Sequence, residues 1–383
     1  MKQINKRVSQ LSDTKLMLSE YHLCNSCLQR LFVAKLGSTL LKRLVTERPQ
    51  KKLVKCYICK NFFSELDTYV KKILDASSGF EFSSFLVGAV LKPSVLDKDD
   101  QVRSKFQLKG IDSVKTDITR ELGRRLRRKT MARVEFISPD VTFTVNFRKE
   151  TYEVSAKPVF LAGRYTKSKR GIPQRQNSCE KCRGRGCNSC HFHGISSFDS
   201  VEGKIAKFLY WKFGSLQIKM TWIGGEDNSS LVLGNGRPFF VKLINPKKRK
   251  PKLVKKVLAA GITINNLKII GSIPKRVIRF KSNIKLQIST EKEIQTSKLK
   301  RIRNLEKNSI SIYENSGKEN KKNVYVIKYK KRSKHSFTIS MVADGGLPLK
   351  RFVEGRNVIP NISDIIDNHC KCEQFDFNNI IVR

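Results

Sequence analysis

Long hydrophobic runs are missing from this chain of 383 residues. Its best apolar run, Phe85 to Leu91, is far shorter than the roughly 20 residues that a membrane-spanning helix requires. Met1 to Gln10 is polar and basic, without the apolar core of a signal peptide, and no long helix carries the Trp/Leu face of a membrane-surface segment. We therefore expect a soluble, cytoplasmic protein without a membrane partner.

Acidic residues are also scarce. Asp and Glu together number 33 against 77 Lys and Arg, which gives a formal net charge of +44. A fold does not need this imbalance, which adds self-repulsion, so the charge indicates a polyanionic partner. The basic residues are spread along the whole chain. This distribution favours nucleic acid over an anionic membrane surface, since each neutralised phosphate releases condensed counterions.

Eight of the ten cysteines occur in C-x2-C pairs. In a reducing cytosol such pairs are metal knuckles or redox motifs far more often than disulfides. We expect two structural four-cysteine zinc sites with no catalytic role. The predicted ligands are Cys24, Cys27, Cys56 and Cys59 for the first site and Cys179, Cys182, Cys187 and Cys190 for the second. Because four cysteines complete a tetrahedral site, the nearby His191 and His193 are expected not to be ligands.

Composition and periodicity divide the chain into four regions. We expect a helical zinc-binding segment over residues 1–75, a mixed RNA-binding domain over 76–170, a zinc-knuckle linker over 171–197 and a single α+β domain over 198–383.

Alternating residues in Val141 to Phe147 predict a strand that pairs with a second one, Thr151 to Leu161. The basic, breaker-rich segment that follows, from Gly163 to Gln174, is predicted to be a linker lying on a partner. Lys115 to Thr130 is predicted to be a helix. Its arginines are interpreted as a phosphate-binding cluster, against the alternative of a solvated face. The run Lys247 to Lys256 is either an exposed loop or a nucleic-acid patch.

One carboxylate stands between two glycine-rich turns. Asp227 follows Gly224-Gly225-Glu226, and Leu233-Gly234-Asn235-Gly236-Arg237-Pro238-Phe239 comes shortly after it. Surrounding cations would keep this carboxylate ionised. By itself the pattern also fits a residue that caps a turn after a strand.

Several motifs together resemble those of the Pus-ten family of THUMP-containing tRNA pseudouridine synthases, and of its archaeal branch in particular. The run Gly224 to Phe239 is similar to that family's catalytic signature, and Gly345-Gly346-Leu347 with Lys350 is similar to its late motif. The segment from Gly163 to Gln174 and the cysteine run from Cys179 to Cys190 also resemble the family. Order and spacing agree over about 160–383, and the N-terminal cysteine pairs agree too.

The resemblance implies an α+β fold, in which an N-terminal zinc-bearing, THUMP-like module is followed by a pseudouridine synthase domain with a mixed sheet. It implies conversion of uridine to pseudouridine at positions 54 and 55 of the tRNA T-loop, with no cofactor for catalysis. By resemblance, Asp227 and Lys350 are expected to be catalytic. The expected substrate-binding residues are Arg164, Arg170, Arg237, Ile284 and Leu349. The partner is tRNA, and the sequence specifies no oligomeric state.

The chain departs from the family pattern around this signature. Gly225 stands where the family has Arg, and Ile284 and Pro348 stand where it has tyrosines. The run Asn228-Ser229-Ser230-Leu231 replaces a charged one. Two functions are therefore open: a tRNA pseudouridine synthase that uses Asp227, or a tRNA-binding protein of the same fold without chemistry. Proximity of Asp227 to Lys350 in one cleft would favour the first.

Overall fold

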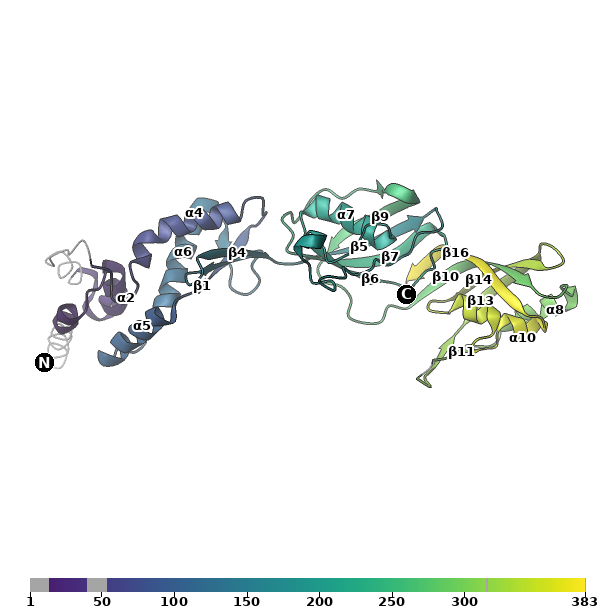
Figure 1. Cartoon of the computed structure of the whole chain (residues 1–383). Helices are drawn as coiled ribbons and strands as arrows, with labels where there is room; N and C mark the ends of the chain where they lie inside the picture. The colour runs from purple at the N-terminus through teal and green to yellow at the C-terminus, as the bar shows by residue number, and fades with distance from the viewer. Residues whose placement is uncertain (1–13, 40–53, 315, 383) are drawn as a thin grey trace. The chain divides into compact units, whose positions relative to one another are not determined.

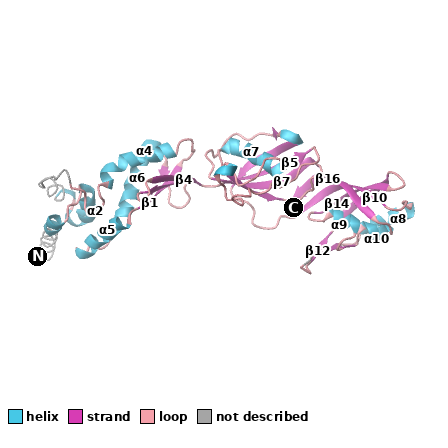
Figure 2. Cartoon of the chain, viewed as in Figure 1, coloured by secondary structure: helices cyan, strands magenta, loops and turns pink. Residues whose placement is uncertain are grey.

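The computed structural model describes residues 14–39, 54–314 and 316–382 (Figure 1). The chain forms two compact units, Met1–Lys157 and Pro158–Arg383. Both combine helices with β-sheet (Figure 2), so the expected α+β class is confirmed. Among the described residues, no helix has the length and apolar character needed to cross a membrane.

The first unit contains a four-stranded mixed sheet with helices packed on it. Its strand order is β2-β1-β3-β4, with β1 parallel to β2 and β3, and with β3 and β4 antiparallel. The strands are β1 (Ser84–Val90), β2 (Arg133–Val134), β3 (Val141–Asn146) and β4 (Thr151–Ala156). The helices are α2 (Asn25–Leu36), η1 (Phe62–Glu65), α4 (Leu66–Ala76), α5 (Pro93–Lys105) and α6 (Val114–Thr130).

Helix α6 illustrates how the sequence builds this unit. Ser113 caps its start by accepting a hydrogen bond from the Thr116 amide, which satisfies a donor that has no partner within the helix. Leu122 and Leu126 lie one turn apart and are fully buried, so this face of the helix contributes to the core of the unit.

The predicted phosphate-binding cluster on α6 is largely neutralised within the protein. Arg120 pairs with Asp112 and Asp117, whereas Arg124 and Arg125 both pair with Glu121. Arg127 and Arg128, near the end of the helix, are exposed and form no ion pair with any described residue. Any phosphate contact from this helix is therefore expected at its C-terminal end.

The second unit is built on a nine-stranded sheet with the order β13-β14-β10-β16-β7-β5-β9-β8, in which β6 also pairs with β7. All neighbours are antiparallel except β7 and β16, which are parallel at Val232 and Phe377. A separate three-stranded sheet has the order β12-β11-β15. Apolar side chains from the large sheet and the surrounding helices form a continuous core.

The bounds of these elements follow. The strands are β5 (Val159–Lys167), β6 (Gln217–Trp222), β7 (Val232–Ile244), β8 (Lys256–Val257), β9 (Ile262–Ile270), β10 (Phe280–Thr290), β11 (Ile310–Tyr313), β12 (Glu319–Lys322), β13 (Val324–Lys331), β14 (Ser336–Asp344), β15 (Val358–Ile359) and β16 (Cys370–Val382). The helices are η2 (Asn188–Cys190), α7 (Val201–Phe213), η3 (Ala259–Gly261), α8 (Thr296–Lys300), η4 (Arg301–Glu306), α9 (Leu349–Glu354) and α10 (Ile362–Ile366).

The region around the unit boundary differs from the sequence prediction. The hairpin is present, but β4 ends at Ala156, and β5 begins a new strand that pairs with β7 and β9 in the second unit. The prediction of one strand over 151–161 and of a linker from residue 163 is therefore wrong. Tyr165 and Lys167 are fully buried, because β5 lies inside the sheet with a neighbour on each side. The division falls at Lys157/Pro158, earlier than the expected boundary at residue 170.

Candidate active site and cysteine clusters

Asp227 lies in the loop between β6 and β7, which are antiparallel partners. The loop leads directly into Val232, the residue at which β7 meets β16 in parallel. Strand β7 lies inside the large sheet and β6 is paired with it from Gln217 to Trp222, so the loop is held by a paired strand at each end. Such a base can hold a reactive carboxylate in a fixed position.

Ser229 holds the carboxylate of Asp227, and Ser230 holds its backbone. Oδ1 accepts hydrogen bonds from the amide of Ser229 at 2.8 Å and from its hydroxyl at 2.9 Å. The hydroxyl of Ser230 lies 3.0 Å from the Asp227 amide and 2.8 Å from its carbonyl oxygen. The run that departs from the family pattern thus supplies the local contacts of the carboxylate, a role that its sequence did not suggest.

The other carboxylate oxygen of Asp227 faces Lys350. The Nζ atom of Lys350, in the first turn of α9, donates to Oδ2 at 2.6 Å. Partial burial alone would raise the pKa of Asp227, but the hydrogen bonds from Lys350 and Ser229 outweigh burial and lower it below its ordinary 3.8. The hydrogen bond to Asp227 raises the pKa of Lys350 above 10.5. Both groups are therefore ionised at neutral pH.

Glu226, the neighbour of Asp227, has a different environment. Its side chain is 0% exposed and lies between Lys167 Nζ at 3.1 Å and Arg237 Nε at 3.3 Å. Arg237 also donates to the carbonyl oxygen of Ile223 at 3.0 Å, and its guanidinium lies 4.3 Å from the Phe377 ring. Lys167 donates in addition to the carbonyl oxygen of Asp227 at 3.1 Å. This buried network fixes the backbone on the N-terminal side of Asp227.

Arg170 and Arg164 fix the C-terminal side of the loop and the start of β7. Arg170 forms a two-bonded pair with Asp376 of β16, at 2.7 and 2.8 Å, and donates to the carbonyl oxygen of Ser229. Arg164 donates to the carbonyl oxygens of Gly236 at 2.7 Å and Ile380 at 2.9 Å. Neither arginine lines the cavity beside Asp227, although both were expected among the substrate-binding residues.

A cavity of about 480 Å³ opens beside Asp227 and Lys350, within the size range of small-ligand pockets. Three of the expected substrate-binding residues line it, namely Arg237, Ile284 and Leu349. Ile284 and Leu349 are 3% and 5% exposed and contribute apolar surface. The buried Nη2 atom of Arg237 and the buried hydroxyl of Ser282, which also lines the cavity, have no hydrogen-bond partner among the described residues. The cavity therefore combines an ionised carboxylate, apolar walls and two unused donors.

Phe280, at the first position of β10, adds an aromatic ring that the sequence analysis missed. Its ring lies against two glycines. A Cβ atom at Gly345 would come within 2.3 Å of the ring, and one at Gly224 within 2.6 Å. Both glycines belong to the motifs identified from the sequence, so their lack of a side chain makes room for this ring. The available signal was an aromatic residue four positions before Ile284, where the family has a tyrosine.

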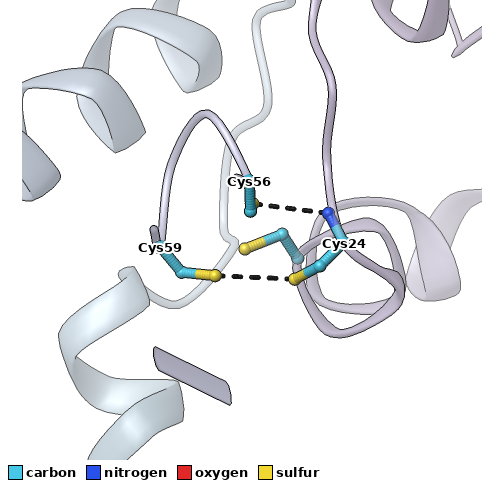
Figure 3. A group of neighbouring side chains, drawn as sticks. Cys24, Cys56 and Cys59 are labelled. Carbon is cyan, nitrogen blue, oxygen red and sulfur yellow. Dashed lines mark hydrogen bonds between the residues drawn. The ribbon is translucent and has the colours of Figure 1, made fainter. Parts of the chain in front are cut away.

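The first cysteine cluster brings together Cys24, Cys27, Cys56 and Cys59, whose Sγ atoms all lie within 4.8 Å of one another. Figure 3 shows the sulfurs of Cys24 and Cys59 facing each other, 3.5 Å apart, beside Cys56. The amide of Cys24 donates to the sulfur of Cys56 at 3.3 Å. Amide donors stabilise thiolates, and four sulfurs in this arrangement fit a tetrahedral metal ion.

The second cluster, Cys179, Cys182, Cys187 and Cys190, meets the same 4.8 Å limit. Amides of Gly186 and Gly194 each donate to a cysteine sulfur at 3.2 Å. A Cβ atom at Gly194 would lie 2.5 Å from the carbonyl oxygen of Gly184. The segment after the second cysteine pair can therefore approach the turn between the two pairs only because residue 194 is glycine. Both predicted clusters could thus hold a metal ion. His193 instead stacks on Tyr210, with ring centroids 4.2 Å apart.

Comparison with known proteins identifies the family to which these motifs belong. A model of the C-terminal domain of Pus10 matches residues 160–380, and a model of the archaeal Pus10 THUMP domain matches residues 69–146. The tRNA pseudouridine synthase Pus10 of Nitrosopumilus maritimus (strain SCM1) is 46% identical over 369 residues, which cover 96% of this chain and 97% of the relative. The Pus10 of Cenarchaeum symbiosum (strain A) is 34% identical, over 94% and 90%. These matches confirm the THUMP domain and the family expected from the motifs.

Proposed function

This chain belongs to the Pus10 family, and we propose on this basis that it isomerises uridine to pseudouridine in the T-loop of tRNA. The target is position 54, position 55 or both, and Asp227 is the nucleophile. The observation that carries the proposal is the 2.6 Å pair of Lys350 Nζ with Asp227 Oδ2 at the edge of the cavity. The pair keeps an ionised carboxylate at a fixed place beside a cavity, which the chemistry needs and which tRNA binding alone does not.

The reaction replaces the bond from ribose to uracil nitrogen by a bond to uracil carbon, and every atom of the nucleoside is kept apart from exchanged protons. No oxidant, reductant or cofactor is consumed. An ionised carboxylate can attack the ribose or assist departure of the uracil. Lys350 holds the carboxylate in place as a positioning residue, and its hydrogen bond lowers the pKa of Asp227.

The cavity walls suit a uridine that has left its stack. Extruding a base costs a few kcal/mol, and contacts with the flipped base can offset this cost. Phe280 offers a ring face, Ile284 and Leu349 offer apolar packing, and the unused donor on Arg237 can bind a uracil or ribose oxygen. Arg164 and Arg170 are assigned here to positioning of the Asp227 loop instead of to substrate binding.

Zinc, in this proposal, is structural. The two four-sulfur clusters would each hold one ion, and the second would fasten a segment whose hydrophobic cluster consists of the cysteines themselves. The first cluster joins the chain before α2 to the turn after residue 55, and the second forms a ribbon ahead of α7. Neither cluster includes a residue that lines the cavity, so the chemistry does not depend directly on the metal.

Purified protein and a tRNA transcript test the assignment, with pseudouridine mapped by mass spectrometry. We expect pseudouridine in the T-loop, and none with Asp227→Asn, whose fold is checked by its thermal unfolding midpoint. The matched control is Asp199→Asn, an exposed carboxylate before α7. No pseudouridine from metal-loaded, folded protein, or full activity of Asp227→Asn, would refute the proposal.

A further inference from the structure

Three large apolar side chains are exposed where the second cysteine cluster meets α7 and β6. Trp211 is 76% exposed, Leu216 is 50% exposed and Phe192 is 48% exposed. Gathered apolar groups on a surface mark a binding site more often than scattered ones do. None of the three lines the cavity beside Asp227.

His193 joins the segments that carry these side chains. Its ring stacks on Tyr210 at 4.2 Å, and its Nδ1 atom lies 2.8 Å from the carbonyl oxygen of Leu216. Phe192 directly precedes His193 and Trp211 directly follows Tyr210, so all three exposed side chains belong to one locally fixed region. We call this region the ribbon–helix surface. It consists of Phe192, Trp211 and Leu216 together with the nearby basic residues Arg185, Lys212, Lys248 and Lys250.

Basic residues are carried by the segments around these side chains. Lys212 Nζ lies 5.7 Å from the Trp211 ring, and the Gln217 side chain holds the carbonyl oxygen of the exposed Arg185 at 2.7 Å. The Lys248 amide donates to the carbonyl oxygen of Phe213, at the end of α7, at 2.9 Å. This bond brings the basic run after β7, including the exposed Lys248 and Lys250, to the same end of the helix.

From the second turn of α7 onward the charge of this region has one sign, whereas Glu180, Asp199 and Glu202 lie in the ribbon and at the start of α7. Residues 203–225 contain no Asp or Glu, and residues 228–290 contain none either. An exposed tryptophan flanked by cations offers a stacking face and phosphate contacts together, which is how proteins bind unpaired nucleotides. A protein partner of ordinary composition would leave these cations without a systematic counter-charge, whereas RNA supplies one at every nucleotide.

We propose that the ribbon–helix surface is a second RNA-binding site, which stacks an unpaired base of the substrate tRNA on Trp211 and contacts its backbone through Lys248 and Lys250. This proposal rests on the proposed function for its choice of RNA. Strand β6 begins at Gln217 beside the surface and ends at Trp222, before the Asp227 loop. Five steps of about 3.3 Å separate these ends by roughly 17 Å. The bound nucleotide is therefore different from the target uridine.

Binding measurements test this proposal independently of the chemistry. Full-length Asp227→Asn protein serves as the parent, and its affinity for a full tRNA transcript is measured by fluorescence anisotropy over a series of salt concentrations. We expect Trp211→Ala to weaken binding roughly 5- to 150-fold and Trp211→Phe to restore most of it, because stacking needs a ring. Lys248→Gln with Lys250→Gln should reduce the salt slope by about 1–2.

The matched control is Lys328→Gln with Lys330→Gln, two exposed lysines on the edge strand β13 that should leave the affinity unchanged. Thermal unfolding midpoints verify that each variant is folded. Unchanged affinity of Trp211→Ala, or an equal loss in the control pair, would overturn the proposal. So would a Trp211→Ala variant that alters only self-association in sedimentation, since the surface would then bind a second copy. Activity of Asp227→Asn would refute the proposed function without affecting these binding results.

Discussion

Replacing Lys350 by methionine should slow pseudouridine formation about tenfold without changing the charge of Asp227 at neutral pH. A hydrogen bond to a charged group contributes about 1.5–3 kcal/mol. The Lys350 side chain is 50% exposed, so screening by water places this bond at the low end of the range. A loss of about 1.4 kcal/mol is a tenfold loss of rate. Asp227 keeps both donors of Ser229, and an unperturbed aspartate is ionised at neutral pH.

The pH dependence separates positioning from charge. The folded-state pKa of Asp227 lies below 3.8 and that of Lys350 above 10.5. The stabilisation from the pair is therefore lost as pH falls through the first pKa or rises through the second, and it is constant between them. In Lys350→Met the pKa of Asp227 should rise toward 3.8, which moves the acid limb of the rate profile upward, and the alkaline limb from Lys350 should disappear.

Single-turnover rates with saturating tRNA, measured across the pH range, provide the assay. Lys350→Arg should retain more activity than Lys350→Met because it keeps a cation at the site. Lys371→Met removes an exposed lysine that pairs with Glu373 and serves as the matched control. If Lys350→Met is as inactive as Asp227→Asn, Lys350 takes a direct part in the chemistry. If its rate is unchanged at every pH, the pair does not position the carboxylate.

Two further predictions concern the cavity wall and the cysteine clusters. Phe280→Ala should lower kcat/KM roughly 5- to 150-fold, which corresponds to the free energy of stacking one base on a ring, while Phe280→Tyr keeps the ring and most of the activity. Steady-state kinetics with a tRNA transcript measure this effect. A normal kcat/KM for Phe280→Ala would show that the ring does not contact the substrate. Elemental analysis should find two zinc ions per chain, one of them lost in Cys27→Ser and the other in Cys182→Ser. Removal of the zinc by a chelator should lower the thermal unfolding midpoint of the wild-type protein. If the midpoint stays the same after the metal has been removed, the zinc has no structural role.

The sequence predicted the elements whose signal is local. The cysteine pairs have ligand spacing, and the β3–β4 hairpin has alternating residues around a polar turn. Proximity of Asp227 to Lys350 was the test that the sequence analysis set between the two functions, and the pair forms although the two residues are 123 positions apart. Their motifs singled out both residues, because periodicity carries no information about so distant a contact.

What the sequence did not predict depends on pairing between distant segments. Strand β5 contains Arg164 and Lys167, and these charges made it look like a surface linker. Lys167 is nevertheless buried, because Glu226 from another loop supplies its counter-charge at 3.1 Å. Arg170 likewise resembled an RNA contact, but its partner is Asp376, 206 residues away. A charged residue in a single sequence does not show whether its partner is RNA or another part of the fold.

Strand β16, the last strand of the large sheet in the sequence, holds the loop that carries Asp227. Asp376 holds Arg170 and the amide of Leu231, and the carbonyl oxygen of Ile380 holds Arg164. The loop that carries Asp227 is thus fixed by a strand that the ribosome makes after every other strand of the sheet. Under the proposed function, the carboxylate of Asp227 is therefore in place only after β16 has been made and has paired with β7.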